Sequence, residues 1–64
     1  MEWLKKIRLE KGLTHDDIAR GVGIQRAYFT MIENGRKRPS VDIAKKIGNL
    51  LGFDWTRFFE VDPE

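Results

Sequence analysis

The 64-residue chain contains no cysteine and only one histidine, His15. Without cysteine, neither a disulfide nor a thiolate zinc site can stabilise the fold, and a lone histidine gives no basis for a structural metal. We therefore expect no metal and no cofactor. A chain of this length buries only about 60% of the surface of its unfolded state, so the core is small and we expect a partner chain to support it.

Long apolar stretches are also absent. No segment approaches the roughly 20 apolar residues of a membrane span. Residues 1–13 alternate charged and apolar side chains, unlike the uninterrupted apolar core of a signal peptide. These patterns predict a cytoplasmic protein that does not bind a membrane.

The sequence gives no sign of catalytic chemistry or of a small-molecule ligand. His15 has no evident serine partner, and the neighbouring Asp16 and Asp17 are explained as charges at the start of a helix. The segment "GVG" at 21–23 lacks the lysine and the spacing of a phosphate-binding loop. We therefore do not expect an enzyme.

The charges are unevenly distributed, although the net charge is only +2. Residues 20–46 hold seven basic and two acidic residues, a net charge of +5, whereas residues 54–64 hold one basic and four acidic residues, a net charge of −3. A basic middle and an acidic tail over 60–64 suggest a surface that faces a polyanion, with the tail turned away from it. A merely solvated charged face explains the same pattern, and charge alone does not decide between the two.

Apolar residues recur at intervals of three and four, which predicts an all-α fold without strands. There is no internal repeat and no linker, so we expect a single domain over 1–64. The expected helices cover 2–11, a segment after Thr14 that glycines 21 and 23 break, 25–33, 41–51, and a short segment after Asp54.

Local signals mark the ends of these helices. Thr14, with Asp17 three residues later, predicts a capped helix start, and Ser40 predicts another before residue 41. Gly52 predicts the end of the fourth helix. Gly48, inside that helix, costs about 1 kcal/mol relative to alanine, which suggests close packing there.

The second and third helices, joined around Gly23, form a helix-turn-helix over about 14–33. From Leu4 to Phe59 the chain resembles the Xre-like helix-turn-helix family, the DNA-binding domains of phage repressors, in "IRLEKGLTHDDIA", "GVGI", "MIENGRKRPS" and "LLGFDW". The resemblance implies a compact five-helix lambda-repressor-like domain. It also implies a transcriptional regulator, expected to be a repressor, whose partner is double-stranded DNA.

The third helix carries side chains with no obvious core to enter. Residues at the N-terminal end of a recognition helix reach base edges in the major groove. Arginine can form two bonds with guanine, glutamine can do so with adenine, and alanine can meet a thymine methyl. The predicted base contacts are Gln25, Arg26, Ala27, Thr30 and Met31. An ordinary solvent-facing surface in a protein-binding domain is the alternative.

A second group is predicted to contact phosphates, which positions a protein without reading sequence. Its members are Tyr28, Asn34, Arg36, Lys37, Arg38 and, at the start of the second helix, His15. The family usually has glutamine at the position of His15 and smaller or polar residues at those of Tyr28 and Met31, which leaves the operator sequence open. For Tyr28, partial burial beneath the following loop is the alternative.

The resemblance further implies an ion pair between Arg8 and Glu33 that joins the first helix to the end of the third. We also expect a homodimer on a palindromic operator, because one short helix makes few base contacts. Trp55, Phe58 and Phe59 are the candidates for its interface, except for whichever of them fills the core. The alternative function is a protein-interaction module or an antitoxin-like regulator of the same fold.

Overall fold

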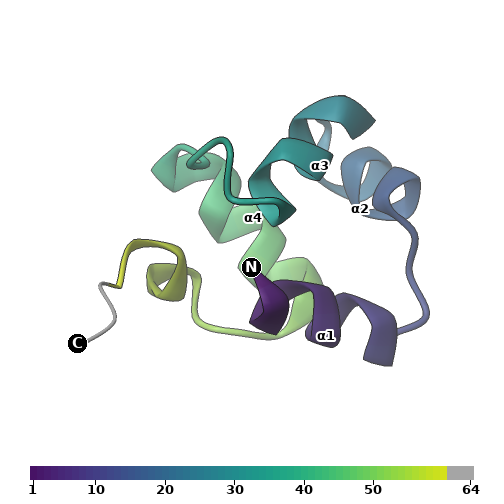
Figure 1. Cartoon of the computed structure of the whole chain (residues 1–64), viewed down its shortest axis with the longest axis horizontal. Coiled ribbons are helices and arrows are strands. Elements are labelled where there is room, and N and C mark those ends of the chain that lie inside the picture. The colour runs from purple at the N-terminus through teal and green to yellow at the C-terminus, as the bar shows by residue number, and fades with distance from the viewer. Residues whose placement is uncertain (61–64) are drawn as a thin grey trace.

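The computed structural model describes residues 1–60, and within that range all regular structure is helical, which confirms the predicted all-α class (Figure 1). The elements are α1 (Glu2–Glu10), α2 (His15–Val22), α3 (Arg26–Glu33), α4 (Val41–Leu51) and the 3-10 turn η1 (Trp55–Phe59). The acidic tail was predicted over 60–64, and its residues after 60 lie outside the described part of the chain. No helix within 1–60 is long and apolar enough to cross a membrane.

The arrangement places α4 in the middle of the molecule (Figure 1). α4 contacts both α2 and η1, and α3 contacts α2 and α1. α2 and α3 therefore sit side by side as the predicted helix-turn-helix, and α3 has one side turned away from the rest of the chain (Figure 1).

The start of α2 has the predicted capping box. The Asp17 N–H donates to Thr14 Oγ1 at 3.0 Å, and the Thr14 N–H donates to the Asp17 carboxylate at 2.9 Å. The bond that the Asp17 carboxylate accepts from the Thr14 backbone N–H, aided by the Thr14 side chain, holds the pKa of this carboxyl below its ordinary value. At the other end of α2 the expectation was partly wrong: Gly21 lies inside the helix, and only Gly23 ends it, with φ of +85°.

α4 has the predicted bounds. The Ser40 hydroxyl accepts a bond from the Ile43 N–H at 3.2 Å, and Gly52 ends the helix with φ of +80°. The predicted fifth helix forms as the 3-10 turn η1, which begins where the Asp54 carboxylate accepts a bond from the Thr56 N–H at 3.0 Å.

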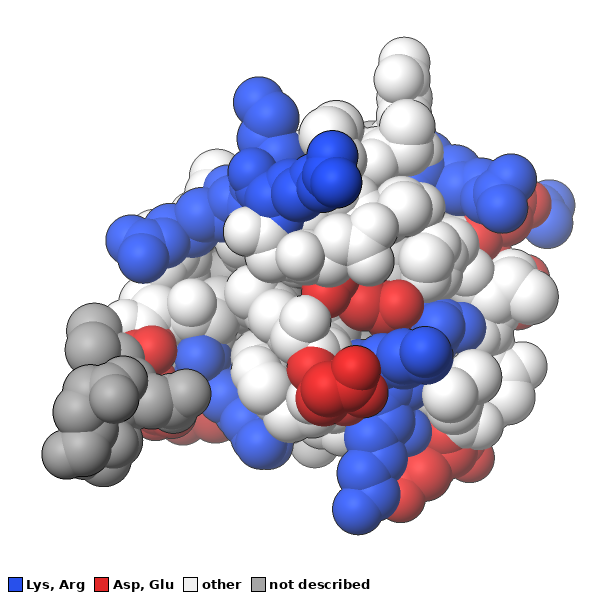
Figure 2. Space-filling model, viewed as in Figure 1, with Lys and Arg blue, Asp and Glu red and all other residues white. Residues whose placement is uncertain are grey.

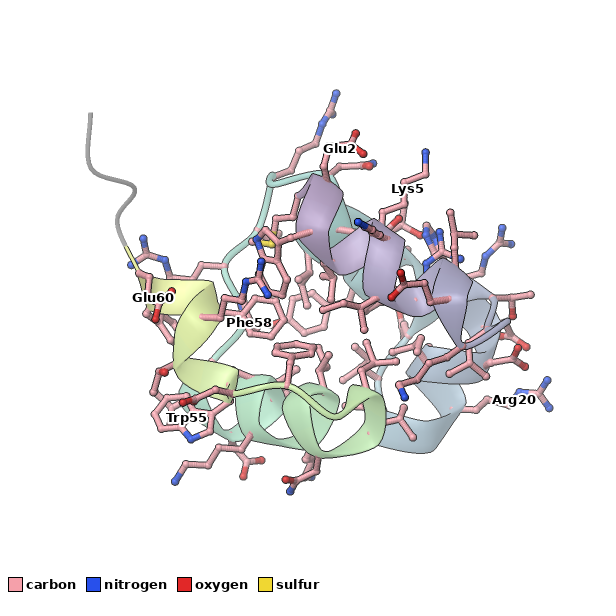
Figure 3. All side chains as sticks on the ribbon, turned by 90° about the horizontal axis from the view of Figure 1, so that it is seen from below. Glu2, Lys5, Arg20, Trp55, Phe58 and Glu60 are labelled. Carbon is pink, nitrogen blue, oxygen red and sulfur yellow. The ribbon has the colours of Figure 1, made fainter. Side chains whose placement is uncertain are left out.

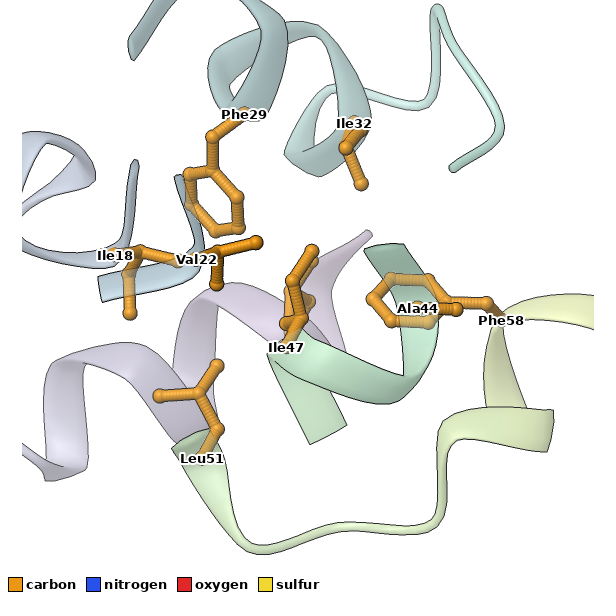
Figure 4. Close-up of a cluster of buried hydrophobic side chains, with 9 residues drawn as sticks. Ile18, Val22, Phe29, Ile32, Ala44, Ile47, Leu51 and Phe58 are labelled. Atoms are coloured by element: carbon orange, nitrogen blue, oxygen red, sulfur yellow. The ribbon is translucent and has the colours of Figure 1, made fainter. Parts of the chain in front are cut away.

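The core lies between α4 and the other elements (Figure 4). Phe58 belongs to it and is only 6% exposed, so it is the one of the three interface candidates that fills the core and is excluded on that ground. Leu9 on α1 lies outside this core and is 57% exposed. The core cluster consists of Leu4, Ile18, Val22, Phe29, Ile32, Ala44, Ile47, Leu51 and Phe58.

Gly48 explains how η1 lies so close to α4. A Cβ at this position would lie 2.7 Å from the Phe53 carbonyl oxygen and 3.2 Å from the Trp55 nitrogen. The segment that leads into η1 therefore passes directly over a helix position where only glycine leaves room, which confirms the predicted close packing.

Candidate nucleic-acid interface

The outward side of α3 is the main candidate for a binding surface. Gln25 precedes α3 in an extended conformation, and the first turn of the helix follows it. The side chains at the start of the helix are all exposed: Gln25, Arg26 and Ala27. Four of the five predicted base contacts line one shallow hollow on this side, and two predicted phosphate contacts complete it. The lining residues are Arg26, Ala27, Thr30, Met31, Asn34 and Arg36.

The loop after α3 folds back onto the end of that helix. The N–H groups of Arg36 and Lys37 both donate to the Met31 carbonyl, at 2.8 and 3.3 Å, and Gly35 permits the turn with φ of +78°. Residues 34–38 are all exposed. Figure 2 shows Lys and Arg side chains at the upper left of the molecule, where this loop lies in Figure 1.

Two predicted phosphate contacts are engaged elsewhere. The guanidinium carbon of Arg38 lies 5.7 Å from the centre of the Phe59 ring, which connects the loop to η1. Tyr28 is half-buried and packs against the core. Neither residue lines the hollow on α3.

A buried polar network links three helices behind this surface. Arg8 on α1 donates to both carboxylate oxygens of Glu33, from Nε to Oε1 at 2.8 Å and from Nη2 to Oε2 at 3.2 Å, so the ion pair implied by the resemblance is present. Arg8 Nη1 also donates to the Leu13 carbonyl at 2.8 Å. His15 on α2 joins the network, with Nε2 2.8 Å from Glu33 Oε2 and Nδ1 2.8 Å from Thr30 Oγ1.

The network has a clear electrostatic consequence for Glu33. Partial burial raises the pKa of its carboxyl, but the hydrogen bonds from Arg8 and His15 and their charges outweigh burial and hold this pKa below its ordinary value. Glu33 is therefore an ionised side chain only 6% exposed, with partners on two other helices.

The position of His15 differs from the expectation. Both of its ring nitrogens are held by partners within the chain, so a phosphate contact would require one of these bonds to break. The sequence carried no signal for this arrangement across two helices, apart from Thr30 and Glu33 being three residues apart and therefore on one face of α3. We assign His15 to the network and not to the DNA-facing surface.

The aromatic residues of η1 divide between the core and the surface. Figure 3 shows Phe58 directed into the molecule and Trp55 on its outside. Trp55 and Phe59, both half-buried, meet edge to face with ring centres 6.0 Å apart, and Lys45 Nζ lies 5.2 Å from the Trp55 ring centre. Two of the three predicted interface residues thus remain accessible.

Comparison with known proteins supports one family. The helix-turn-helix family model matches residues 4–58. The HTH-type transcriptional regulator YqaF of Bacillus subtilis is 63% identical over 59 residues, which span 92% of this chain and 78% of that protein. The ImmF control region 10 kDa protein of Bacillus phage phi105 is 37% identical over 51 residues, 80% of this chain and 57% of that protein.

A further relative is the control protein C.MunI of a Mycoplasma species, which is 35% identical over 57 residues, 88% of this chain and 77% of that protein. No solved structure matches the chain. The relatives named as regulators and the family match cover the elements that build the surface around α3. The chain therefore belongs to the Xre-type helix-turn-helix family of DNA-binding transcriptional regulators.

Proposed function

We propose that this protein is a sequence-specific regulator that inserts α3 into the major groove of double-stranded DNA. The carrying observation is the hollow on α3, where Arg26, Ala27, Thr30 and Met31 lie together on a surface that the core does not use. An α-helix fits the major groove, and residues near its N-terminus reach the base edges.

Within this proposal, Gln25, Arg26 and Ala27 contact bases first, and Thr30 and Met31 follow one turn along the helix. Arg26 has the chemistry for a two-bond contact with guanine and Gln25 for one with adenine. Their exposure at the start of α3 is consistent with this task.

The loop after α3 would hold the phosphate backbone. Asn34, Arg36 and Lys37 are exposed beside the hollow or next to it in the chain. Arg38 stays in this group, because contact with the face of a ring leaves its N–H donors available. Tyr28 packs against the core and is only half-buried, so it also stays a proposed phosphate contact.

We further propose a homodimer that represses by occupying a palindromic operator. Two copies related by a two-fold axis would read half-sites about one helical turn apart, and two-fold pairs are the commonest closed assemblies. Trp55 and Phe59 are the accessible aromatic residues for the contact. Sedimentation of a saturated palindromic duplex tests this: two chains per duplex are expected, and one chain would contradict the dimer.

A protein-interaction module is the second candidate. It is favoured by a hollow on the outer face of α1, lined mainly by the apolar parts of Trp3 and Leu9 and of the charged side chains beside them. An antitoxin-like regulator would use both this face and α3. The two candidates differ in how binding to DNA depends on salt.

The test measures binding to a random duplex over a series of salt concentrations. A DNA-binding surface releases counterions, so the affinity should fall steeply with salt, by about 0.9 logarithmic units for each neutralised phosphate and each tenfold increase. The double variant Arg36→Ala, Lys37→Ala should weaken binding to every sequence alike and flatten the slope by about one unit for each phosphate that is no longer neutralised. Salt-independent or absent binding would favour the interaction module, and an unchanged slope in the variant would remove the loop from the interface.

A further inference from the structure

The hydroxyl of Thr30 occupies an unusual position between the buried network and the hollow on α3. It lines the hollow, yet its oxygen also lies 2.8 Å from His15 Nδ1 and 3.1 Å from the Arg26 carbonyl oxygen. A hydroxyl has one proton to donate and two lone pairs that accept. Which of these it can offer to DNA depends on where its proton is used.

The proton is used inside the chain in each protonation state of His15. When both ring nitrogens carry hydrogen, Nε2 donates to Glu33, Nδ1 donates to Thr30, and the hydroxyl donates to the Arg26 carbonyl. When only Nε2 carries hydrogen, the hydroxyl can donate to Nδ1 instead. When only Nδ1 carries hydrogen, Thr30 again accepts from it and donates to the carbonyl, although Nε2 then faces the Glu33 carboxylate without a proton.

We propose that Thr30 is therefore an acceptor-only contact, which selects adenine or cytosine on the strand that it faces. Adenine N6 and cytosine N4 are the amine donors of the major groove, whereas guanine and thymine present acceptor oxygens there. An acceptor opposite another acceptor leaves both without a proton. This inference rests on the proposed function, because it presumes that α3 reads bases.

His15 is thereby a positioning residue for specificity. It does not touch DNA in this account; it holds the hydroxyl so that a lone pair, and not the proton, is available to a base. Glu33 and, through it, Arg8 fix the ring of His15 from the other side. Substitution of His15 should consequently change which base is preferred at the position read by Thr30, and not merely the affinity.

The experiment measures relative affinities for all four bases at every position of a preferred duplex selected from a random pool. Thr30→Val keeps the shape but removes the hydroxyl, and should reduce the preference for adenine or cytosine at one position in each half-site by about 2- to 12-fold, the value of one net hydrogen bond. Thr30→Ser keeps the hydroxyl and should keep the preference. His15→Ala leaves the hydroxyl with the Arg26 carbonyl as its internal partner, so the proton can turn to a base at the cost of that one bond. This variant should therefore raise the relative affinity for guanine or thymine at the same position.

The outcomes separate this inference from the proposed function. If no duplex is preferred over random DNA, the proposed function itself fails. If the protein prefers particular bases but Thr30→Val changes none of them, or the affected position favours guanine or thymine in the parent, only the present inference is overturned. A uniform weakening at all positions in folded His15→Ala, verified by thermal unfolding, would show that His15 is purely structural.

Discussion

At the scale of single residues, Glu33 carries the most connections in the site. Its carboxylate lies on α3 and accepts bonds from Arg8 on α1 and His15 on α2. A charge taken out of water is stabilising only when its partners are well placed, and removing one partner leaves the other uncompensated. The orientation of α3 relative to α1 and α2 therefore depends on this one side chain.

Glu33→Gln should destabilise the fold, because Arg8, only 8% exposed, would lose its charged partner. The loss of unfolding free energy should approach the range of about 3–5 kcal/mol found for breaking a buried pair. Thermal or urea unfolding measures it. Glu10→Gln, an exposed control on α1, should change stability by no more than about 0.5 kcal/mol. Equal melting temperatures for Glu33→Gln and the parent would mean that the pair contributes nothing.

The same variant makes a prediction about pH. Because the folded-state pKa of Glu33 lies below the ordinary value of 4.5, its contribution to stability is complete above that pH and is lost as the pH falls through the folded-state value. The difference in unfolding free energy between the parent and Glu33→Gln should thus shrink as the pH falls from 4.5 toward the folded-state pKa of Glu33. Asp17 and Asp54, whose pKa values are also lowered, are present in both proteins and cancel. A difference that stays constant as the pH falls below 4.5 would contradict this account.

Substitution of Arg26 tests whether α3 contacts bases. Arg26→Ala should cost about 1–3 kcal/mol on a preferred duplex and relax the preference at one base pair, as the removal of a two-bond interaction with guanine does. Competition between duplexes that differ at single positions measures this. Arg57→Ala removes the same charge from η1 and should leave the preference intact. Equal weakening on every duplex would make Arg26 a phosphate contact.

At the scale of elements, the sequence predicted best where local chemistry decides. The bounds of α4 and the cap of α2 follow from Ser40, Gly52 and Thr14, whose effects act within one turn. Gly21 misled the prediction because glycine tolerates the helical conformation at a modest cost, and only the positive φ at Gly23 enforces a stop.

The spacing of apolar residues did not predict which side chain of η1 enters the core. A 3-10 turn directs residues inward at a spacing different from that of an α-helix, so the choice of Phe58 for the core over Trp55 or Phe59 could not be predicted from the sequence. His15 was hidden for a related reason. Its partners lie 15 and 18 residues away on another helix, and the packing of α2 against α3 brings them together.

Two helical glycines offer a matched test of element packing. Gly48→Ala should lower the unfolding free energy by about 1–3 kcal/mol, because its methyl would meet the Phe53 backbone oxygen at 2.7 Å. Gly21→Ala meets only the end of the exposed Leu50 side chain, at 3.0 Å, which can move aside. It should leave stability unchanged or raise it by up to about 1 kcal/mol through helix propensity. Unfolding measurements that rank the two variants equally would contradict the close approach of η1 to α4.

At the scale of the whole molecule, the fold separates two kinds of surface. The side formed by α3 and its following loop gathers base-contact candidates and exposed basic residues (Figure 2). η1 lies at the other end of the molecule from the helix-turn-helix and offers Trp55 on its outside (Figures 1 and 3). The proposed dimer on a palindrome would use the first surface for DNA and the second for another copy of the chain.

The most direct test of this account is the selection of bound duplexes from a random pool by the unaltered protein. We expect enrichment of a palindrome whose half-sites lie about one helical turn apart, with strong preference at the few positions that α3 can reach. Recovery of the pool without any preferred sequence, at a salt concentration where the protein binds DNA, would contradict the claim that α3 reads bases.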